Sequence, residues 1–398
     1  MKSEAQADNK MEKESIEEEE GMDKELWEKL PEELLPIILA KLPVRSLAQF
    51  RSVCKSWSSL WYSESFAQLR SSTPPERSWF IFNNYNNDYC LIDGSFSYDI
   101  SCNKWHKFVP NLPSQIERVA ASAGGLLFCV SRPSIMVPVP GSVPGYHWPD
   151  MFVCNPLKES WIRLVQRPGY WQPIIVGMVA DPVARTYKVI LADRCQGTEI
   201  YDSRTKSWKL IGKRPTTAFL RTNNSISVKE KLVTTGALSL LVFDSKEERW
   251  SSIGYPVGSI SHPQISNCHG RLHLVGFLPD ENRLEVWDRQ ELDGNGHWNR
   301  LYSSVLGRFS PVYMGTAECA EFLARSEPDD LLCYAKLFSA RTVFDSELSD
   351  HCLYEKFVGR VLFYSISQNS WCLVDKRHVD VKSIGESFRF DPTVGASV

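Results

Sequence analysis

The sequence lacks the features by which several classes of protein are recognised. Its eleven cysteines form no C-x-x-C pair, so no zinc site or thioredoxin-like motif is indicated. Apolar runs such as 173–180 are far shorter than the roughly 20 residues that span a bilayer. Lysine and arginine form no cluster of the kind that binds nucleic acids. Because no secretory signal pattern is found, we expect reduced cysteines and a nuclear or cytosolic location.

Motifs of catalytic and metal sites are also absent. G-x-S-x-G, the P-loop, the Rossmann fingerprint and H-E-x-x-H do not occur. His262, Cys268, His269 and His273 have a spacing that fits no zinc pattern, and a structural role is favoured. Residues 293–296 resemble the start of a calcium loop but lack the remaining ligands, which favours a turn. We therefore predict no catalytic residue, metal or cofactor.

The first 25 residues differ in charge from the rest of the chain. They hold ten acidic and four basic side chains, a charge of −6, whereas all 398 residues together carry −3. They contain almost no large apolar residues, so burial of apolar surface cannot offset the entropy lost on folding. Residues 1–25 are therefore predicted to be a disordered acidic tail.

A short helical module is predicted at residues 26–60. Pro31 and the two glutamates after it suit the first turn of a helix, and apolar residues then recur at helical spacing up to Leu42. Pro36 either moves the start of the regular helix to about Leu34 or bends the helix. Two further short helices are expected. The module is too small to enclose a core, so its apolar face packs either on a partner or on the rest of the chain.

The module closely resembles the F-box. The residues that carry the resemblance are Leu30, Pro31, Glu33, Leu34, Leu35, Ile38, Leu42, Pro43, Leu47, Val53, Cys54, Lys55 and Trp57. The F-box of this family docks on a Skp-type linker protein within SCF ubiquitin ligases. The resemblance therefore implies linker contacts by Leu30, Pro31, Leu34, Leu35, Ile38, Leu42, Leu47, Val53, Cys54 and Trp57. Some of these residues are instead expected to hold the helices together. A connector is predicted at 61–78.

From Trp79 onward one pattern recurs, in which an apolar strand ends at an acidic or polar residue and a tryptophan follows. The pairs are Asp99 and Trp105, Asn155 and Trp161, Asp202 and Trp208, Asp244 and Trp250, Asp288 and Trp298, and Ser365 and Trp371. Successive tryptophans are 56, 47, 42, 48 and 73 residues apart. A period near 50 in a strand-rich chain is typical of propeller blades.

Each repeat fits a hairpin. The Asp, Asn or Ser side chain bonds to backbone groups of the turn, and the tryptophan opens the returning strand as an apolar anchor between neighbouring sheets. We therefore predict a mainly β fold, a six-bladed β-propeller over 79–398. The body resembles the kelch repeats of plant-type F-box/kelch proteins, although only Gly124-Gly125 keeps the double glycine. Residues 181–189 are similar to a segment of plant F-box-associated domains, which are also propeller-like.

Three features bear on the number of blades. The interval between Trp298 and Trp371 is long enough for a degenerate seventh hairpin, of which Phe344-Asp345 would be the relic. We interpret 317–337 instead as an insertion, partly helical. Residues 387–390 are a candidate strand that closes the ring against the first blade.

Two loops are candidate target-binding sites. Residues 131–150 contain Tyr146 and Trp148 in a proline-rich run, and Arg167, Tyr170 and Trp171 form a second aromatic loop. Exposed Tyr, Trp and Arg dominate the energetics of protein interfaces. The alternative is that both loops are variable connections that cap a blade.

The resemblance implies a function. It is that of a non-catalytic substrate-recognition subunit of an SCF-type ubiquitin ligase, with a Skp-type linker, a cullin and RING protein reached through it, and an unknown target protein as partners. Two alternatives stay open. One is a propeller enzyme or small-molecule sensor with a helical head, and the other is an F-box scaffold that acts outside ubiquitination.

Overall fold

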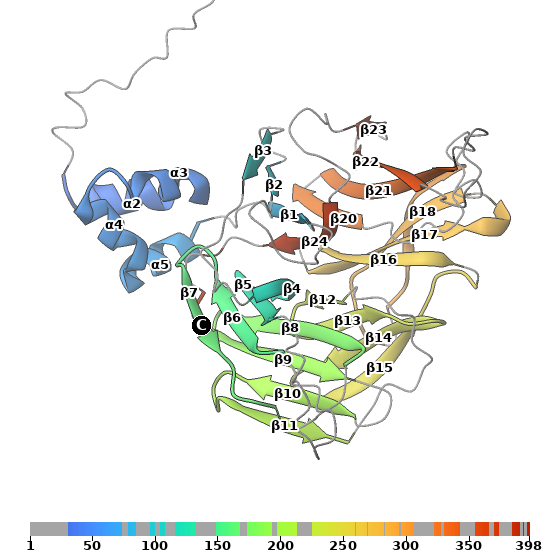
Figure 1. Ribbon diagram of the computed structural model, residues 1–398, viewed down its shortest axis with the longest axis horizontal. Coiled ribbons are helices and arrows are strands. Elements are labelled where there is room, and N and C mark those ends of the chain that lie inside the picture. The colour runs from blue at the N-terminus through green and yellow to red at the C-terminus, as the bar shows by residue number, and fades with distance from the viewer. Residues whose placement is uncertain are drawn as a thin grey trace, which may run out of the picture. The chain divides into compact units, whose positions relative to one another are not determined.

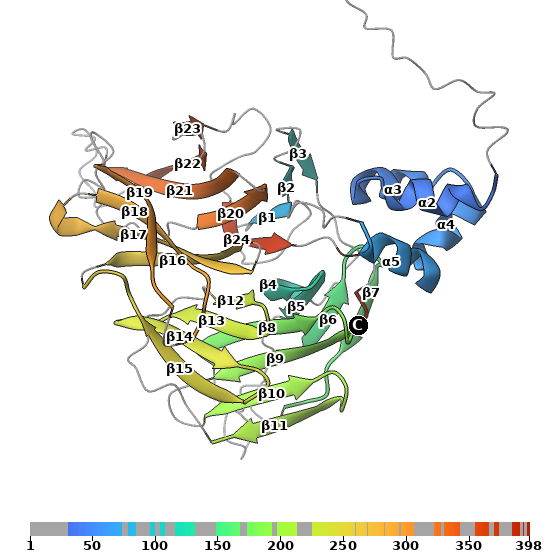
Figure 2. The ribbon, with the colours of Figure 1, turned by 180° about the vertical axis from the view of Figure 1, so that it is seen from behind.

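The computed structural model divides the chain into two compact units, Met1–Thr73 and Pro74–Val398, drawn in Figures 1 and 2. It describes residues 31–73, 79–84, 96–99, 104–107, 116–131, 149–167, 173–192, 197–212, 225–258, 260–268, 270–281, 283–293, 296–305, 322–327, 330–342, 355–365, 370–373, 384–390, 393 and 396–398.

The described part of the first unit contains four helices. They are α2 (Leu34–Ala40), α3 (Val44–Phe50), α4 (Lys55–Tyr62) and α5 (Glu64–Ser71). Pro36 is the third residue of α2, where a backbone N–H has no partner within the helix, so the proline costs no hydrogen bond. The Cys54 sulfur accepts a hydrogen bond from the backbone N–H of Trp57 at 3.5 Å and caps α4. In the same way Ser63 Oγ accepts from the N–H of Phe66 at 3.1 Å and caps α5.

Helix α5 completes the core of this unit. Leu39, Val44, Leu47, Trp61 and Phe66 are buried together with Ala40 and Ala67. The Arg70 guanidinium of α5 donates to the Ala40 carbonyl at 2.8 Å and also to that of Leu42, which satisfies carbonyls at the end of α2. The helical unit therefore extends beyond Leu60, into the segment that the sequence pattern presents as a connector.

In the part of the chain that the structure describes, the second unit consists of six four-stranded antiparallel sheets. The first contains β24 (Ile384–Phe390), β1 (Trp79–Asn84), β2 (Phe96–Asp99) and β3 (Lys104–Lys107). The second contains β4 (Ile116–Ala123), β5 (Leu126–Ser131), β6 (Met151–Asn155) and β7 (Ser160–Arg163). The third contains β8 (Ile175–Asp181), β9 (Thr186–Ala192), β10 (Thr198–Asp202) and β11 (Ser207–Ile211).

The remaining three sheets have the same order. The fourth contains β12 (Ser225–Val228), β13 (Lys231–Thr235), β14 (Ser239–Asp244) and β15 (Arg249–Gly254). The fifth contains β16 (Ser261–Cys268), β17 (Arg271–Leu278), β18 (Arg283–Arg289) and β19 (Asn299–Val305), with the 3-10 turn η1 (Pro279–Glu281) before β18. The sixth contains β20 (Phe322–Glu327), β21 (Asp330–Thr342), β22 (Glu355–Ser365) and β23 (Ser370–Leu373).

Successive sheets contact one another through their first strands, in the order β24, β4, β8, β12, β16 and β20. Figures 1 and 2 show these strands towards the middle of the β unit and strands such as β11 and β15 towards its outside. Strand β24 pairs with β1, with Trp79 opposite Phe390 and Ile81 opposite Phe388. The predicted closing strand is thereby confirmed, and the fold is a six-sheet propeller.

The sixth sheet corrects one prediction. Residues 317–337 were expected to be a partly helical insertion, but β20 and β21 occupy 322–327 and 330–342. These strands pair with each other and β21 pairs with β22, so they supply the first two strands of the sheet. Phe344-Asp345, the candidate relic of a seventh hairpin, lies outside the described residues.

Apolar side chains fill the spaces between sheets, and successive residues of a strand point into the spaces on opposite sides of its sheet. In β9, Val189 and Leu191 belong to the cluster shared with the second sheet, whereas Ile190 and Ala192 belong to the cluster shared with the fourth. This alternation follows from the two-residue period of a strand. Gly177 in β8 lies so close to Leu232 of the fourth sheet that a Cβ atom would overlap the leucine side chain.

The predicted turn chemistry is confirmed in three sheets. Oδ1 of Asn155 accepts hydrogen bonds from two backbone N–H groups at 3.0 Å. Oδ1 of Asp202 accepts from the N–H of Arg204 at 2.9 Å, and Oδ1 of Asp244 accepts from two N–H groups at 2.9 and 3.0 Å. The residue four places later has a positive φ in each of these turns, 52°, 51° and 50°. These positive φ angles could not be predicted, because the positions hold Glu or Lys rather than Gly.

The fifth hairpin departs from the prediction. Asp288 is buried, and its carboxylate is paired with Arg271 of β17 rather than with the turn that follows. The register of β18 and β19 shifts between Val286 and Trp287. The connection to β19 is longer than the corresponding turns in the neighbouring sheets, so Asp288 no longer sits at the start of a tight turn.

The repeat tryptophans tie each sheet to the preceding one. Trp208 Nε1 donates to the Val165 carbonyl at 2.8 Å. Trp250 Nε1 donates to Thr198 Oγ1 at 2.8 Å, and Trp298 Nε1 donates to the Gly254 carbonyl at 2.9 Å. Since every acceptor belongs to the previous sheet or to the connection that leaves it, the predicted role as an anchor between sheets is confirmed for these three residues.

Candidate functional site

The structure divides the predicted linker contacts of the helical unit by exposure. Leu47 is buried and holds the helices together, while Pro31 and Cys54 are exposed. Leu34 is 44% exposed and Val53 60% exposed. The remaining contacts within the described residues are half-buried, namely Leu35, Ile38, Leu42 and Trp57. Leu30 lies outside the described residues, and which of the others touch a linker stays a prediction.

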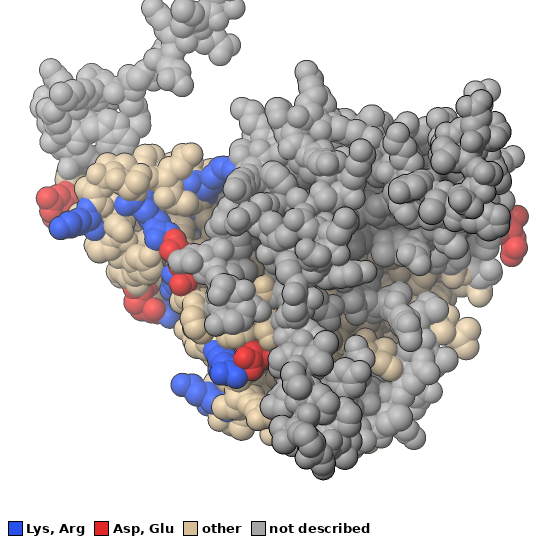
Figure 3. All heavy atoms as spheres, in the orientation of Figure 1, with Lys and Arg blue, Asp and Glu red and all other residues tan. Residues whose placement is uncertain are grey.

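Three exposed apolar residues of this unit were not predicted. They are Ile37, Tyr62 and Leu69. Ile37 lies three residues after Leu34 and therefore faces the same side of α2, which the helical spacing could have revealed. In the view of Figure 3, much of the described surface of the helical unit carries neither Asp and Glu nor Lys and Arg. Large exposed apolar residues on a small unit are typical of an interaction surface.

Internal contacts fix the region around Val53. The Phe50 and Trp57 rings meet edge to face, with 5.3 Å between their centroids. Arg51 lies over the rings of Trp61 and Tyr62 at 5.5 and 5.4 Å and donates to the Tyr62 hydroxyl at 2.7 Å. The turn that presents Val53 is thus held on both sides by packed aromatic residues.

In the propeller, strand direction separates two ends. In the second to sixth sheets, the turns between the first and second strands and between the third and fourth strands share one end, because adjacent strands are antiparallel; we call it the turn end. In the first sheet, only the turn between β2 and β3 belongs to this end, since β24 and β1 are distant in the chain. Connections between the second and third strands, and from one sheet to the next, share the other, which we call the loop end. The turn end has short turns such as 203–206, whereas the loop end has connections as long as 132–150.

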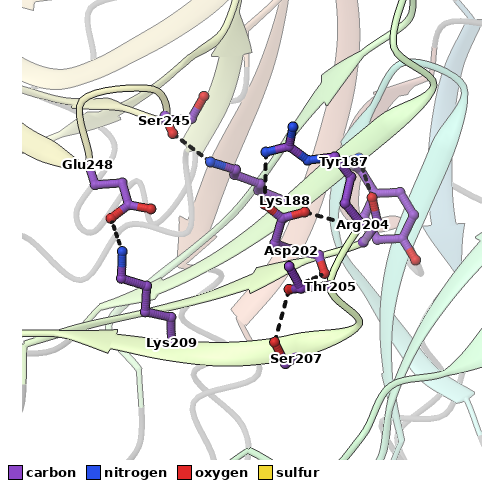
Figure 4. A network of polar contacts seen from close by, with 10 residues as sticks. Tyr187, Lys188, Asp202, Arg204, Thr205, Ser207, Lys209, Ser245 and Glu248 are labelled. Carbon is purple, nitrogen blue, oxygen red and sulfur yellow. Dashed lines mark hydrogen bonds and ion pairs between the residues drawn. The ribbon is translucent and has the colours of Figure 1, made fainter.

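Polar contacts join neighbouring sheets at the turn end (Figure 4). Lys188 Nζ of the third sheet donates to the Ser245 carbonyl of the fourth at 2.7 Å. Lys209 Nζ lies 2.6 Å from Glu248 Oε2 in the same pair of sheets. Charges at this end are therefore engaged in holding turns together.

Two of the recurrent acids at the turn end, Asp202 and Asp244, are also structural. Burial raises the pKa of Asp202, but hydrogen bonds from the Arg204 backbone and guanidinium lower it more, and the pKa lies below its usual range. For Asp244 the same balance holds, with the N–H groups of Glu247 and Lys246 and the ammonium of Lys231 lowering the pKa. A depressed pKa keeps both carboxylates charged as hydrogen-bond acceptors.

The bases of the two predicted target loops meet at the loop end. Ser131, which precedes the first loop, donates its N–H to the Asp150 carbonyl at 2.8 Å, and its hydroxyl accepts from the Asp150 N–H at 2.7 Å. The Asp150 carboxylate lies 2.5 Å from the Arg163 guanidinium, at the end of β7 where the second loop begins. Both loops thus leave the sheet from one joined base.

The structure corrects the prediction for Arg167. It was predicted as an exposed binding residue, but its side chain and that of Glu199 in β10 are each 1% exposed, with 3.4 Å between Nη1 and Oε2. Burial of a charge requires a partner, and here the partner lies in the next sheet. The other predicted target-loop residues, Tyr146, Trp148, Tyr170 and Trp171, lie outside the described residues.

Two exposed apolar residues at the loop end were not predicted. Val165 is half-exposed beside the base of the second loop, and Leu238 on the connection between β13 and β14 is 80% exposed. Neither stands out in the sequence, since both follow ordinary apolar strands. They add apolar surface to the end that carries the long loops.

Of the four residues considered for a metal site, the structure describes one side chain. His273 is buried in β17, His269 lies outside the described residues, and side-chain positions of His262 and Cys268 are not described. Within the described ranges, no three His, Cys, Asp or Glu residues gather in a way that could hold a metal ion. No helix among them is long and apolar enough to cross a membrane.

Comparison with known proteins identifies residues 27–69 as an F-box domain. F-box only protein 6 of Arabidopsis thaliana is 28% identical over 288 residues, which cover 68% of this chain and 58% of that protein. The chain thus spans less than two thirds of that relative. An F-box/kelch-repeat protein of the same plant is 21% identical over 352 residues, covering 76% of this chain and 78% of the relative.

Proposed function

The chain is an F-box protein related to those of plants, and from that premise we propose that it is a substrate-recognition subunit of an SCF-type ubiquitin ligase. The observation that carries the proposal is the junction of an F-box domain at 27–69 with a six-sheet propeller in one chain. The F-box attaches the chain to a Skp-type linker, and the linker connects it to a cullin and RING protein. We place this assembly in the nucleus or cytosol.

Linker binding is attributed to the apolar residues that the helical unit exposes. Full burial of a fully exposed apolar side chain contributes about 1.5–3 kcal/mol, and Leu34 and Val53, which are 44% and 60% exposed, can gain part of that on docking. Leu47 is buried already and contributes to the stability of the unit instead. We therefore attribute the affinity for the linker to the exposed residues. The buried residues stabilise the conformation in which the helical unit presents them.

Target binding is attributed to the loop end of the propeller. The long connections leave the second sheet from the base formed by Asp150 and Arg163, and loops on a rigid scaffold are the usual carriers of recognition. The chain performs no bond chemistry in this role. It raises the concentration of a bound target near the ubiquitin-loaded partner, which is catalysis by proximity.

Titration calorimetry with a Skp-type linker tests the proposal. Leu34→Ala and Val53→Ala should each weaken binding about tenfold, since truncating an interface anchor costs about 1–2 kcal/mol, without changing the unfolding midpoint of the helical unit. Val183→Ala is the matched control, because Val183 is 93% exposed on a propeller turn and its loss should leave linker affinity unchanged. A wild-type chain that does not bind the linker refutes the proposal.

A second experiment separates a ligase from a scaffold. Proteins that co-purify with the chain should accumulate when the proteasome is inhibited and should carry ubiquitin only when the linker site is intact. If co-purifying proteins have the same abundance and the same modification with the Leu34→Ala, Val53→Ala double variant, the ligase role is wrong.

A further inference from the structure

We infer that the turn end of the second sheet is a built binding site for a segment of this chain, Thr393 and residues 396–398, and that its occupation clamps the propeller ring shut. This inference does not rest on the proposed ligase role. The segment follows β24, the strand that completes the first sheet, and reaches over to the second. One stretch of chain thereby bridges two neighbouring sheets.

The first observation is the residue at position 155. In the third and fourth sheets the corresponding residue is an aspartate, whose second carboxylate oxygen faces a cation. Asp202 Oδ2 lies 3.4 Å from the Arg204 guanidinium and Asp244 Oδ2 lies 3.2 Å from the Lys231 ammonium. In the second sheet the position holds Asn155, and its Nδ2 donates to the Ala396 carbonyl at 2.8 Å.

The asparagine at position 155, where the other two sheets have an aspartate, matches a change of hydrogen-bond partner from a cation to a carbonyl. Oδ1 of Asn155 accepts two backbone hydrogen bonds of its own turn, just as in the aspartates, which fixes the amide with Nδ2 towards the segment. The second polar atom of the side chain at position 155 must donate a hydrogen bond, because its partner is the Ala396 carbonyl. The side chain is fully buried, where an unmatched polar pair is costly.

The second observation is the double glycine. Gly124 and Gly125 form the turn between β4 and β5 with φ of 56° and 81°. A Cβ atom on Gly125 would lie 2.6 Å from Thr393 Cβ and 3.1 Å from the Thr393 backbone nitrogen. The missing side chain therefore makes the space that Thr393 fills.

The third observation is apolar packing. Ala396 and Val398 pack against the buried cluster that the second and third sheets share. The Ala396 N–H donates to the Thr393 carbonyl at 3.3 Å. The site thus offers a hydrogen-bond donor, a space without a side chain and an apolar surface, and the segment supplies the matching carbonyl, threonine and small apolar residues.

Hydrogen–deuterium exchange of the full chain tests the inference. Asn155→Asp puts a carboxylate oxygen against the Ala396 carbonyl, so exchange of a peptide covering 393–398 should rise about tenfold, the equivalent of about 1.4 kcal/mol in the opening equilibrium. Asp244→Asn is the matched control, because it changes the same turn position in the fourth sheet. It should leave exchange of the segment at the wild-type rate.

Two results would overturn the inference. One is wild-type exchange of the segment in Asn155→Asp, and the other is exchange in the wild-type chain as fast as in a free peptide of the same sequence. A cycle with Gly125→Ala and Thr393→Gly tests the site without residue 155. Gly125→Ala should raise exchange of the segment more when Thr393 is present than in Thr393→Gly, where only the backbone contact with residue 393 and the strain of a positive φ remain; equal effects in both backgrounds contradict the fit.

Discussion

The bond between Trp250 and Thr198 gives a direct test of how the sheets are held together. Trp250 opens β15, and its Nε1 donates across to Thr198 Oγ1 at the start of β10, 2.8 Å away. Its ring also lies against Phe243, with 5.0 Å between the centroids. Trp250→Phe keeps an aromatic ring beside Phe243 and removes the donor.

The expected loss has two parts. A hydrogen bond to a buried hydroxyl contributes about 1 kcal/mol, because the hydroxyl loses a partner that water cannot replace. Removal of the second indole ring leaves a gap in a half-buried position and costs about another 1 kcal/mol. We therefore expect Trp250→Phe to lower the free energy of unfolding of the propeller by roughly 2 kcal/mol.

Urea unfolding followed by circular dichroism at 25 °C measures the loss, and a double-mutant cycle with Thr198→Val isolates the bond. The coupling energy between Trp250→Phe and Thr198→Val should be about 1 kcal/mol. Trp161→Phe provides a control at the same position of the second sheet, where the tryptophan is 48% exposed, and should cost less. If the two single losses add within about 0.3 kcal/mol, the bond does not join the sheets energetically.

The remaining predictions concern local geometry and charge. Gly177→Ala should lower the free energy of unfolding by about 1–3 kcal/mol in urea titrations, because the new methyl overlaps Leu232. Leu232→Ala removes a buried side chain and is itself destabilising, but in that background Gly177→Ala should cost less, and an equal cost in both backgrounds would contradict the overlap. Lys206→Gly should raise the melting temperature, with a gain of about 0.5–1 kcal/mol, since φ is 51° there, whereas Lys206→Ala should not. The pKa of Asp202 lies below its usual range, so its contribution is present above the usual pKa and is lost as the pH falls through the lower, folded value. Thermal melts of Asp202→Asn should therefore lose less stability than wild type between about pH 4 and pH 2, and parallel curves would be contrary to this account.

Local chemistry explains why the hairpins could be predicted. A polar residue that starts a turn and a tryptophan six residues later are set by contacts within a few residues, as at Asp202 and Trp208, so the sequence carries the signal. The closing strand could also be predicted. Alternating apolar residues near Phe390 indicate a strand, and no hairpin partner for it is found in the neighbouring sequence. The F-box pattern was recognised for the same reason, since its positions lie close together.

Other features depend on partners that are distant in sequence. The burial of Arg167 follows from Glu199 in the next sheet, and no local pattern reveals that pairing. Asp288 has a different role from the one predicted, because the turn after it is longer and its carboxylate pairs with Arg271 instead. Residues 330–342 form strand β21 because β22 pairs with it, and β20 (322–327) pairs with β21 in turn, which overrides the local pattern taken for a helix. At position 155 the reason for Asn became visible only when Ala396 was seen beside it.

Because β1 pairs with β24, the first sheet stays incomplete during synthesis until β24 has been made. Trp79 pairs with Phe390, and at about 5–20 residues per second a ribosome needs roughly 15–60 s to make the chain between them. For that time the inner edge of β1, the edge that β24 later covers, has its N–H and C=O groups unpaired, and an open strand edge is a template for wrong pairing. The nascent chain therefore has its greatest need of a chaperone on its first sheet, while later sheets are already complete.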